Sequence, residues 1–101
     1  MTAKGYWNVA GSISNPAGMA PYLQAVEPYL AKYGARFLCR DLNTDVREGS
    51  PGPLTVIIEF ESVAAAQAAY DSPEYQEMIK LRQPHSDVCL SIIEEGDHAG
   101  H

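Results

Sequence analysis

The most regular alternation of apolar and polar positions lies between Leu54 and Phe60, and it predicts an extended strand at the centre of the fold. One side of that strand is entirely apolar: Leu54, Val56, Ile58 and Phe60. The other side carries Ile57 and the carboxylate of Glu59. Both faces of the strand are therefore expected to be covered, one of them with a charged group.

Two helices are predicted to follow this strand. Ser62 is a suitable N-cap for an alanine-rich helix over residues 63–70, because a serine hydroxyl can accept a hydrogen bond from the first turn. Ser72 followed by Pro73 predicts the start of a second helix, since proline is tolerated at the first helical position.

The first third of the chain predicts a strand and then a helix. Residues 5–13 alternate in the manner of a strand, and Asn15 with Pro16 signals a helix start. The predicted inward stripe of this helix recurs every three or four residues: Met19, Tyr22, Val26, Tyr29 and Tyr33. Pro21 and Pro28 conflict with a regular helix, because an interior proline removes a backbone hydrogen bond. We therefore expect a bent or late-starting helix.

Two further strands complete the pattern. Residues 35–40 predict a strand that continues raggedly to Val46, with Phe37 and Cys39 facing opposite to Arg40. A turn rich in glycine and proline follows at residues 49–53 and predicts a hairpin. The last strand is expected over residues 88–93.

The order strand, helix, strand, strand, helix pair, strand predicts an α+β fold. Specifically, we expect a ferredoxin-like βαββαβ sandwich with a four-stranded antiparallel sheet in the order 4-1-3-2. Residues 1–95 form one domain in this prediction, and residues 96–101 form a flexible tail. The helices can cover only one sheet face, and the other carries an apolar set, Tyr6, Leu38, Ile57 and Ile93. A homodimer that packs sheet against sheet, as a dimeric α/β barrel, would cover it.

Charge and segment composition exclude several functions. The 101-residue chain has a formal net charge of -6, and its lysines and arginines form no basic stripe, so nucleic-acid binding is not expected. No segment approaches the roughly 18 apolar residues of a membrane span, so no membrane association is expected. The start of the sequence shows no leader pattern, and the predicted location is the cytoplasm.

Four segments resemble the domain of unknown function 1330 family: KGYW at residues 4–7, KYGARFLCR at 32–40, VIIEFES at 56–62 and YDSPEYQ at 70–76. The resemblance spans roughly residues 4 to 95. It implies a dimeric α/β barrel related in fold to small cofactor-free monooxygenases and isomerase-like proteins, with no established reaction and no catalytic set to transfer. The sequence departs from the usual pattern at Ala35, where a second glycine is common, and at Asn8, where an aliphatic residue is common.

Glu59 is the first candidate for chemistry. Strand parity places it on the same face as Arg40 and Asn8, and a buried carboxylate must be paired or shift its pKa. Glu59 and Arg40 are therefore candidate catalytic residues, with Glu59 as a general base in a cavity. The alternative is a structural ion pair at the dimer interface, which perturbs pKa values without catalysing a reaction.

Aromatic and cationic groups form the candidate substrate-binding set: Asn8, Tyr6, Tyr22, Tyr75 and Arg82. The phenols could orient an oxygenated substrate, whereas their helical spacing also fits core packing. Arg82 with His85 could bind a carboxylate, although a cation at a helix C-terminus also complements the helix dipole. No metal and no cofactor are predicted, since His98, His101 and Asp97 fit a solvated tail better than a metal site with fixed geometry.

Three classes of function remain open. The chain could be a cofactor-independent enzyme, resembling a monooxygenase or an isomerase, that acts on a small oxygenated apolar metabolite. It could be a non-catalytic small-molecule binder, or a structural dimer with a filled barrel. The predicted strand order places Cys39 and Cys89 on opposite edges about 14 Å apart, so both are expected to be free thiols, small and buried.

Overall fold

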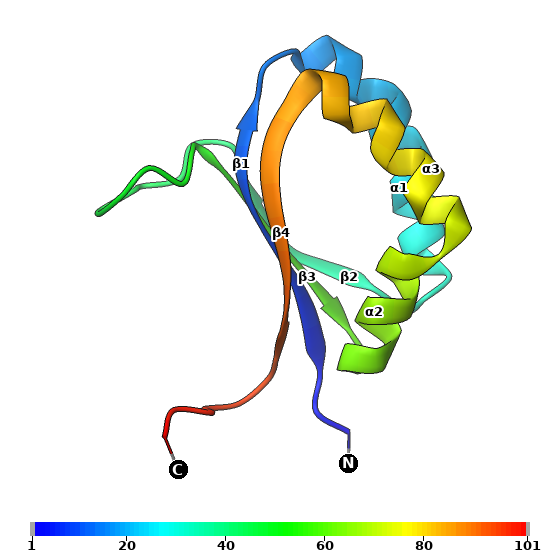
Figure 1. The fold of residues 1–101 in the computed structure, drawn as a ribbon, viewed down its shortest axis with the longest axis vertical. Helices are drawn as coiled ribbons and strands as arrows, with labels where there is room; N and C mark the ends of the chain where they lie inside the picture. The colour runs from blue at the N-terminus through cyan, green and yellow to red at the C-terminus, as the bar shows by residue number, and fades with distance from the viewer. Residues whose placement is uncertain (1, 101) are drawn as a thin grey trace.

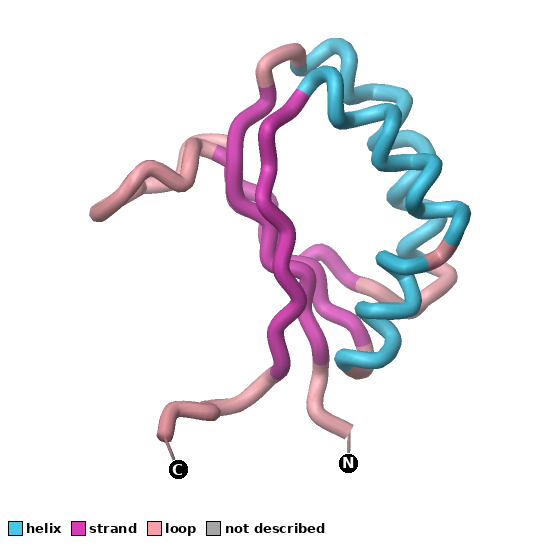
Figure 2. Tube along the Cα trace, in the orientation of Figure 1, coloured by secondary structure: helices cyan, strands magenta, loops and turns pink. Residues whose placement is uncertain are grey.

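The computed structural model describes residues 2–100, which form one four-stranded antiparallel sheet covered by helices on one face (Figure 1). The strand order is β2-β3-β1-β4, which is the predicted order 4-1-3-2 read from the other edge. The elements along the chain are β1 (Gly5–Ile13), the 3-10 helix η1 (Pro16–Met19), α1 (Ala20–Ala31), β2 (Arg36–Asp41), β3 (Leu54–Phe60), α2 (Val63–Asp71), α3 (Pro73–Arg82), the 3-10 helix η2 (Gln83–His85) and β4 (Ser86–Glu94). Figure 2 shows all the helices on the same side of the strands. The predicted ferredoxin-like fold is confirmed.

The helices α2 and α3 begin where the sequence predicts, whereas Asn15 starts only a 3-10 helix and makes no side-chain cap. Ser62 Oγ accepts a hydrogen bond from the Ala65 N–H at 3.0 Å and caps α2, and Ser72 Oγ accepts one from the Tyr75 N–H at 3.0 Å and caps α3. The first helical segment starts as the 3-10 helix η1 and becomes α-helical only at Ala20, with Pro28 inside α1. The expected late start is confirmed, because the prolines restrict the hydrogen bonds that an earlier α-helix would need.

Trp7 lies at the centre of the hydrophobic core, between the sheet and the helices. Its side chain is 1% exposed, and its indole N–H donates a hydrogen bond to the Ala66 carbonyl of α2 at 2.9 Å. The ring centroid lies 5.1 Å from that of Phe60 and 4.9 Å from that of Tyr75. Trp7 thus links β1, β3 and two helices by packing, and its polar atom is satisfied.

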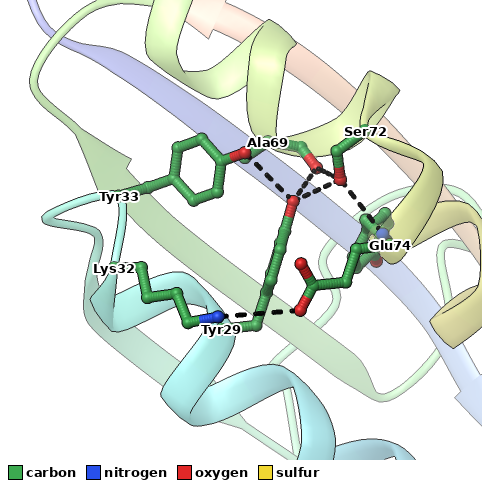
Figure 3. A network of polar contacts seen from close by, with 7 residues as sticks. Tyr29, Lys32, Tyr33, Ala69, Ser72 and Glu74 are labelled. Carbon is green, nitrogen blue, oxygen red and sulfur yellow. Dashed lines mark hydrogen bonds and ion pairs between the residues drawn. The ribbon is translucent and has the colours of Figure 1, made fainter.

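A second buried contact joins α1 to the junction of α2 and α3. The Tyr29 hydroxyl donates a hydrogen bond to the Ala69 carbonyl at 3.0 Å and also contacts the Ser72 hydroxyl and, at 3.3 Å, that of Tyr33 (Figure 3). Lys32 lies 3.8 Å from the Glu74 carboxylate across the same boundary. These contacts hold α1 in place above the sheet, against the junction of α2 and α3.

The strand β2 differs from the prediction in two ways. It ends at Asp41 and does not continue to Val46; residues 42–53 instead form a connection that projects away from the helices (Figure 1). The pairing with β3 also shifts between Phe37 and Cys39, which leaves Leu38 without a partner in register. This bulge reverses the alternation beyond it, so the predicted facing of Arg40 and Cys39 is wrong.

The two cysteines lie on the sheet face without helices, on opposite edge strands. Both are free thiols, as predicted, but both are exposed, so the expectation that they are buried is wrong. Cys39 changed face because of the bulge. Cys89 alternates with Val88 and Leu90, which face the helices.

Candidate functional site

A cavity of about 430 Å³ lies between the helix-covered face of the sheet and the helices α1 and α3. Its floor comes from all four strands, and its roof comes from η1, α1 and α3. The walls are predominantly apolar, and they include the side chains of Trp7, Val9, Val26, Leu30, Val56 and Leu90. A volume in this range suits a small-molecule site rather than a packing defect.

Among the described lining residues, the indole N–H of Trp7 is already bonded to Ala66, and the other polar side chains are Tyr22, Arg40, Tyr75 and Arg82. Their contacts divide these four residues into two groups: Tyr22, Tyr75 and Arg82 contact one another, and Arg40 stands apart from them. Tyr22 and Arg82 lie within 5.7 Å of each other, measured from the ring centroid to the guanidinium carbon, and the Tyr22 and Tyr75 hydroxyls are 2.8 Å apart. Arg40 instead contacts Phe37 and Glu27.

The first group, which we call the phenol-arginine cluster, consists of Tyr22, Tyr75 and Arg82. Burial raises the pKa of the Tyr22 phenol well above its ordinary value, and the neighbouring Tyr75 raises it further, so Tyr22 stays protonated at neutral pH. Burial lowers the pKa of Arg82, but its contacts with Tyr75 and Tyr22 outweigh that effect and the pKa is raised. The cluster therefore presents hydroxyl groups beside a permanent positive charge.

Arg40 lies at the edge of the cavity and is not beside Glu59, contrary to the prediction. Its guanidinium stacks on the Phe37 ring at 4.1 Å from the centroid, and Nη1 lies 2.9 Å from Oε2 of Glu27 on α1. The bulge at Leu38 is the reason, because it places Arg40 opposite Val56 on the helix-covered face. The charge of Arg40 is thus already paired with a carboxylate.

Glu59, Asn8 and Tyr6 lie on the other face of the sheet and do not line the cavity. Glu59 forms an ion pair with Arg36 at 3.3 Å, and its side chain is only 16% exposed. Burial and the carboxylates of Glu95 and Glu59 raise the pKa of Tyr6. The predicted grouping of Asn8, Arg40 and Glu59 in one pocket is therefore wrong, and Glu59 forms its ion pair with Arg36 and not with Arg40.

The remaining candidates lie outside the cavity. His85 does not line the cavity with Arg82. Its Nδ1 lies 3.2 Å from Nδ2 of Asn15, a residue in the connection after β1. In the tail, His98 contacts the Glu94 carboxylate at 3.5 Å, and His101 lies outside the described residues. Residues 2–100 contain no group of three or more histidine, cysteine or acidic side chains placed to hold a metal ion.

Sequence reasoning named Tyr22, Tyr75 and Arg82 as candidates but grouped them with Tyr6 and Asn8, which do not line the cavity. Trp7, Val9, Val88 and Leu90 alternate along their strands as ordinary core residues do. A filled core and an apolar cavity wall give the same alternation of residues, so no sequence signal separates them. Whether these residues form a filled core or a cavity wall depends on how far above the sheet α1 and α3 pack.

The amino-acid sequence matches a known protein family. Residues 4–96 match the family described as Domain of unknown function (DUF1330). The chain belongs to this family. No curated protein sequence matches it.

In the described part of the chain, no helix has the length and apolar character needed to cross a membrane.

Solved structures of similar fold include three informative ones. A protein of unknown function from Rhodopseudomonas palustris is 18% identical, with a TM-score of 0.73 over 96% of this chain and 85% of that one. A dimeric ferredoxin-like protein of unknown function from Thermobifida fusca is 12% identical, with a TM-score of 0.64 over 94% and 93%. SnoaB, a cofactor-independent oxygenase from Streptomyces nogalater, is 14% identical, with a TM-score of 0.61 over 100% of both chains. At these identities the similarity establishes the fold of this family member and leaves its function open.

Proposed function

We propose that this protein binds a small, predominantly apolar molecule in the cavity between the sheet and the helices. The observation that carries the proposal is the cavity itself, whose volume of about 430 Å³ falls within the range of ligand pockets. Its polar groups are few and gathered in the phenol-arginine cluster, an arrangement that orients a ligand at one end while the apolar walls accept the rest.

Binding ranks above acid–base catalysis because of the residues that line the cavity. Among the described lining residues there is no aspartate, glutamate, histidine or cysteine. An arginine does not lose its proton in a protein, and burial keeps the Tyr22 phenol protonated. General base catalysis most often uses a histidine, carboxylate, lysine or cysteine side chain, and the described lining residues include none of these.

Cofactor-independent oxygenation of a ligand in the same cavity is the second candidate. It is supported by the full-length similarity in fold to SnoaB, which is described as such an oxygenase. That support is an analogy between folds and not between sites, and it therefore ranks below binding. Oxygen consumption in the presence of a bound ligand would separate the two candidates.

The binding test uses Trp7, the one tryptophan in the sequence, which lines the cavity and reports on its contents by fluorescence. Octanamide, a neutral molecule with an apolar tail, is expected to change that fluorescence saturably. Val9→Phe should weaken its binding by about tenfold or more, since the added ring occupies the cavity. Leu81→Phe is the matched control, because Leu81 is 40% exposed on α3 and does not line the cavity.

No saturable change with octanamide, by fluorescence and by calorimetry, would refute the binding proposal. Equal affinities for Val9→Phe and the wild-type protein would place any bound molecule elsewhere. Native mass spectrometry of freshly purified protein would show directly whether a ligand is retained.

We also propose that the protein is a homodimer that buries the sheet face without helices. That face carries Tyr6, Ile57 and Ile93, of which Ile93 is 46% exposed, and solved structures of this fold are described as dimeric. Ile93→Glu should convert the dimer to a monomer in light scattering, whereas Leu81→Glu, at a similarly exposed position on α3, should not. A wild-type monomer at micromolar concentration would contradict the proposal.

A cytoplasmic location and a division into residues 1–95 and a flexible tail stay predictions.

A further inference from the structure

We propose that the ligand of this cavity is a monocarboxylic acid with an apolar body, whose carboxylate is bound by Arg82 together with the hydroxyls of Tyr22 and Tyr75. This inference rests on the proposed binding function and names the chemical class of its ligand. It follows from the pairing of charges, from the balance of hydrogen-bond donors and acceptors, and from the net charge at the site.

Arg82 differs from the other arginines in its partners. Arg36 pairs with Glu59 at 3.3 Å, Arg40 with Glu27 at 2.9 Å, and Arg47 with Asp45 at 3.0 Å. Within residues 2–100, Arg82 has no such carboxylate, although it is half-buried against the cavity and packs over the Tyr22 ring. A partly desolvated charge is stabilised by a counter-ion, and the cavity is where one can reach this guanidinium.

The hydroxyl pair beside it has a donor to spare. Tyr22 and Tyr75 each carry one hydroxyl proton, and the 2.8 Å contact between their oxygens uses one of the two. The second proton can be donated to a ligand. The Arg82 guanidinium adds further N–H donors and has no hydrogen-bond acceptor. A site that offers donors and a positive charge suits a group that only accepts hydrogen bonds, which describes a carboxylate.

The dipole of α3 offers a competing explanation for Arg82, as a cation at the last residue of a helix. Two observations favour the ligand role. Lys80 already supplies a cation to the last turn, and Ser86 Oγ satisfies the Arg82 carbonyl at 2.8 Å. The Arg82 side chain lines the cavity, where its charge lies among apolar walls.

The charge of the site selects a monoanion. Arg82 contributes one positive charge, and the charge of Arg40 at the cavity edge is already paired with Glu27. A dianionic phosphate would leave a net negative charge among apolar side chains, which is costly, whereas a carboxylate leaves none. The apolar walls then accommodate a hydrocarbon or aromatic body.

The test compares octanoate with octanamide, which share a chain length and differ in charge, by Trp7 fluorescence at pH 7. Octanoate should bind about tenfold to a hundredfold more tightly than octanamide, the range expected of hydrogen bonds to a charged group. Arg82→Met should abolish this preference and leave octanamide affinity within about twofold. Arg47→Met is the control, because it removes the same charge from an exposed arginine that does not line the cavity, and it should retain the preference.

The possible outcomes separate the inference from the binding function. Equal affinity of octanoate and octanamide for the wild-type protein would overturn the inference and leave binding intact, and this comparison needs no variant to fold. Loss of the preference in Arg40→Met, with the preference kept in Arg82→Met, would place the carboxylate at the other cationic group and would also overturn it. Failure of both molecules to bind would refute the binding function. Arg82→Lys, which keeps the charge and loses the planar fork, should retain part of the preference.

Discussion

Replacing Tyr29 by phenylalanine tests how α1 is held above the cavity. Tyr29 is 3% exposed, and its hydroxyl contacts the Ala69 carbonyl, the Ser72 hydroxyl and the Tyr33 hydroxyl. The ring of phenylalanine fills the same space, so the change removes the polar contacts and leaves the packing. Because Val26 and Leu30 on the same helix line the cavity, any loosening of α1 also reaches the site.

The expected cost is about 1–2 kcal/mol of the free energy of unfolding. One hydrogen bond contributes about 1 kcal/mol net, and a buried group left without its partner adds to that loss. The Ala69 carbonyl would keep only a long contact of 3.4 Å from Ser72 Oγ, whereas Ser72 would still cap α3 by accepting the Tyr75 N–H. For a chain of this size, each kcal/mol lowers Tm by roughly 4–8 °C.

The assay is urea unfolding followed by Trp7 fluorescence, at one protein concentration for all variants because a dimer's stability depends on concentration. Tyr33→Phe is the matched control: it makes the same chemical change at a half-buried hydroxyl whose contact with Tyr29 is 3.3 Å, and it should cost less than about 0.5 kcal/mol. If Tyr29→Phe is as stable as the wild-type protein, or if both variants lose equal stability, the account of this network is wrong.

Three other predictions concern pH, the discarded site and backbone conformation. Burial raises the pKa of Tyr29 to about 12, above the value of about 10 expected in the unfolded chain. The folded state therefore holds a proton that the unfolded state loses, so stability present below pH 10 should fall as the pH rises towards 12, and urea midpoints should fall less in Tyr29→Phe. Glu59→Gln should leave octanamide affinity within about twofold in the fluorescence titration, because Glu59 faces away from the cavity; a tenfold change would restore it to the site. Gly52→Ala should destabilise the fold more than Gly49→Ala in thermal unfolding, since both glycines have a positive φ but only at Gly52 would a Cβ lie 2.2 Å from a backbone oxygen, that of Gly11. Equal losses in the two variants would contradict the importance of that contact.

Part of the candidate site was predictable from the sequence. Tyr22, Tyr75 and Arg82 sit on helices whose starts and spacing are visible as proline, serine and aromatic positions, so their presence near the core follows from helical periodicity. The 2.8 Å contact between the Tyr22 and Tyr75 hydroxyls does not follow, because it depends on how α1 and α3 pack against each other above the sheet. Residues distant in sequence meet there through tertiary packing alone.

The error over Arg40 shows where sequence reasoning fails. Alternation assigns every second residue of a strand to one face, and it assumes that pairing continues without interruption. One unpaired residue, Leu38, reverses the assignment of Arg40 and Cys39 after it. No glycine marks this bulge, so nothing in the local sequence distinguishes it from a regular strand.

The amino-acid sequence by itself determined the order of the elements, the helix caps at Ser62 and Ser72, and the strand order, because these depend on short-range periodicity and on the few ways that such elements connect. Only the tertiary structure decided which face of the sheet holds the cavity and which cation lies in it without a carboxylate partner. Those features arise from the bulge in β2 and from the space left beneath α1 and α3, and both depend on contacts between residues far apart in the chain.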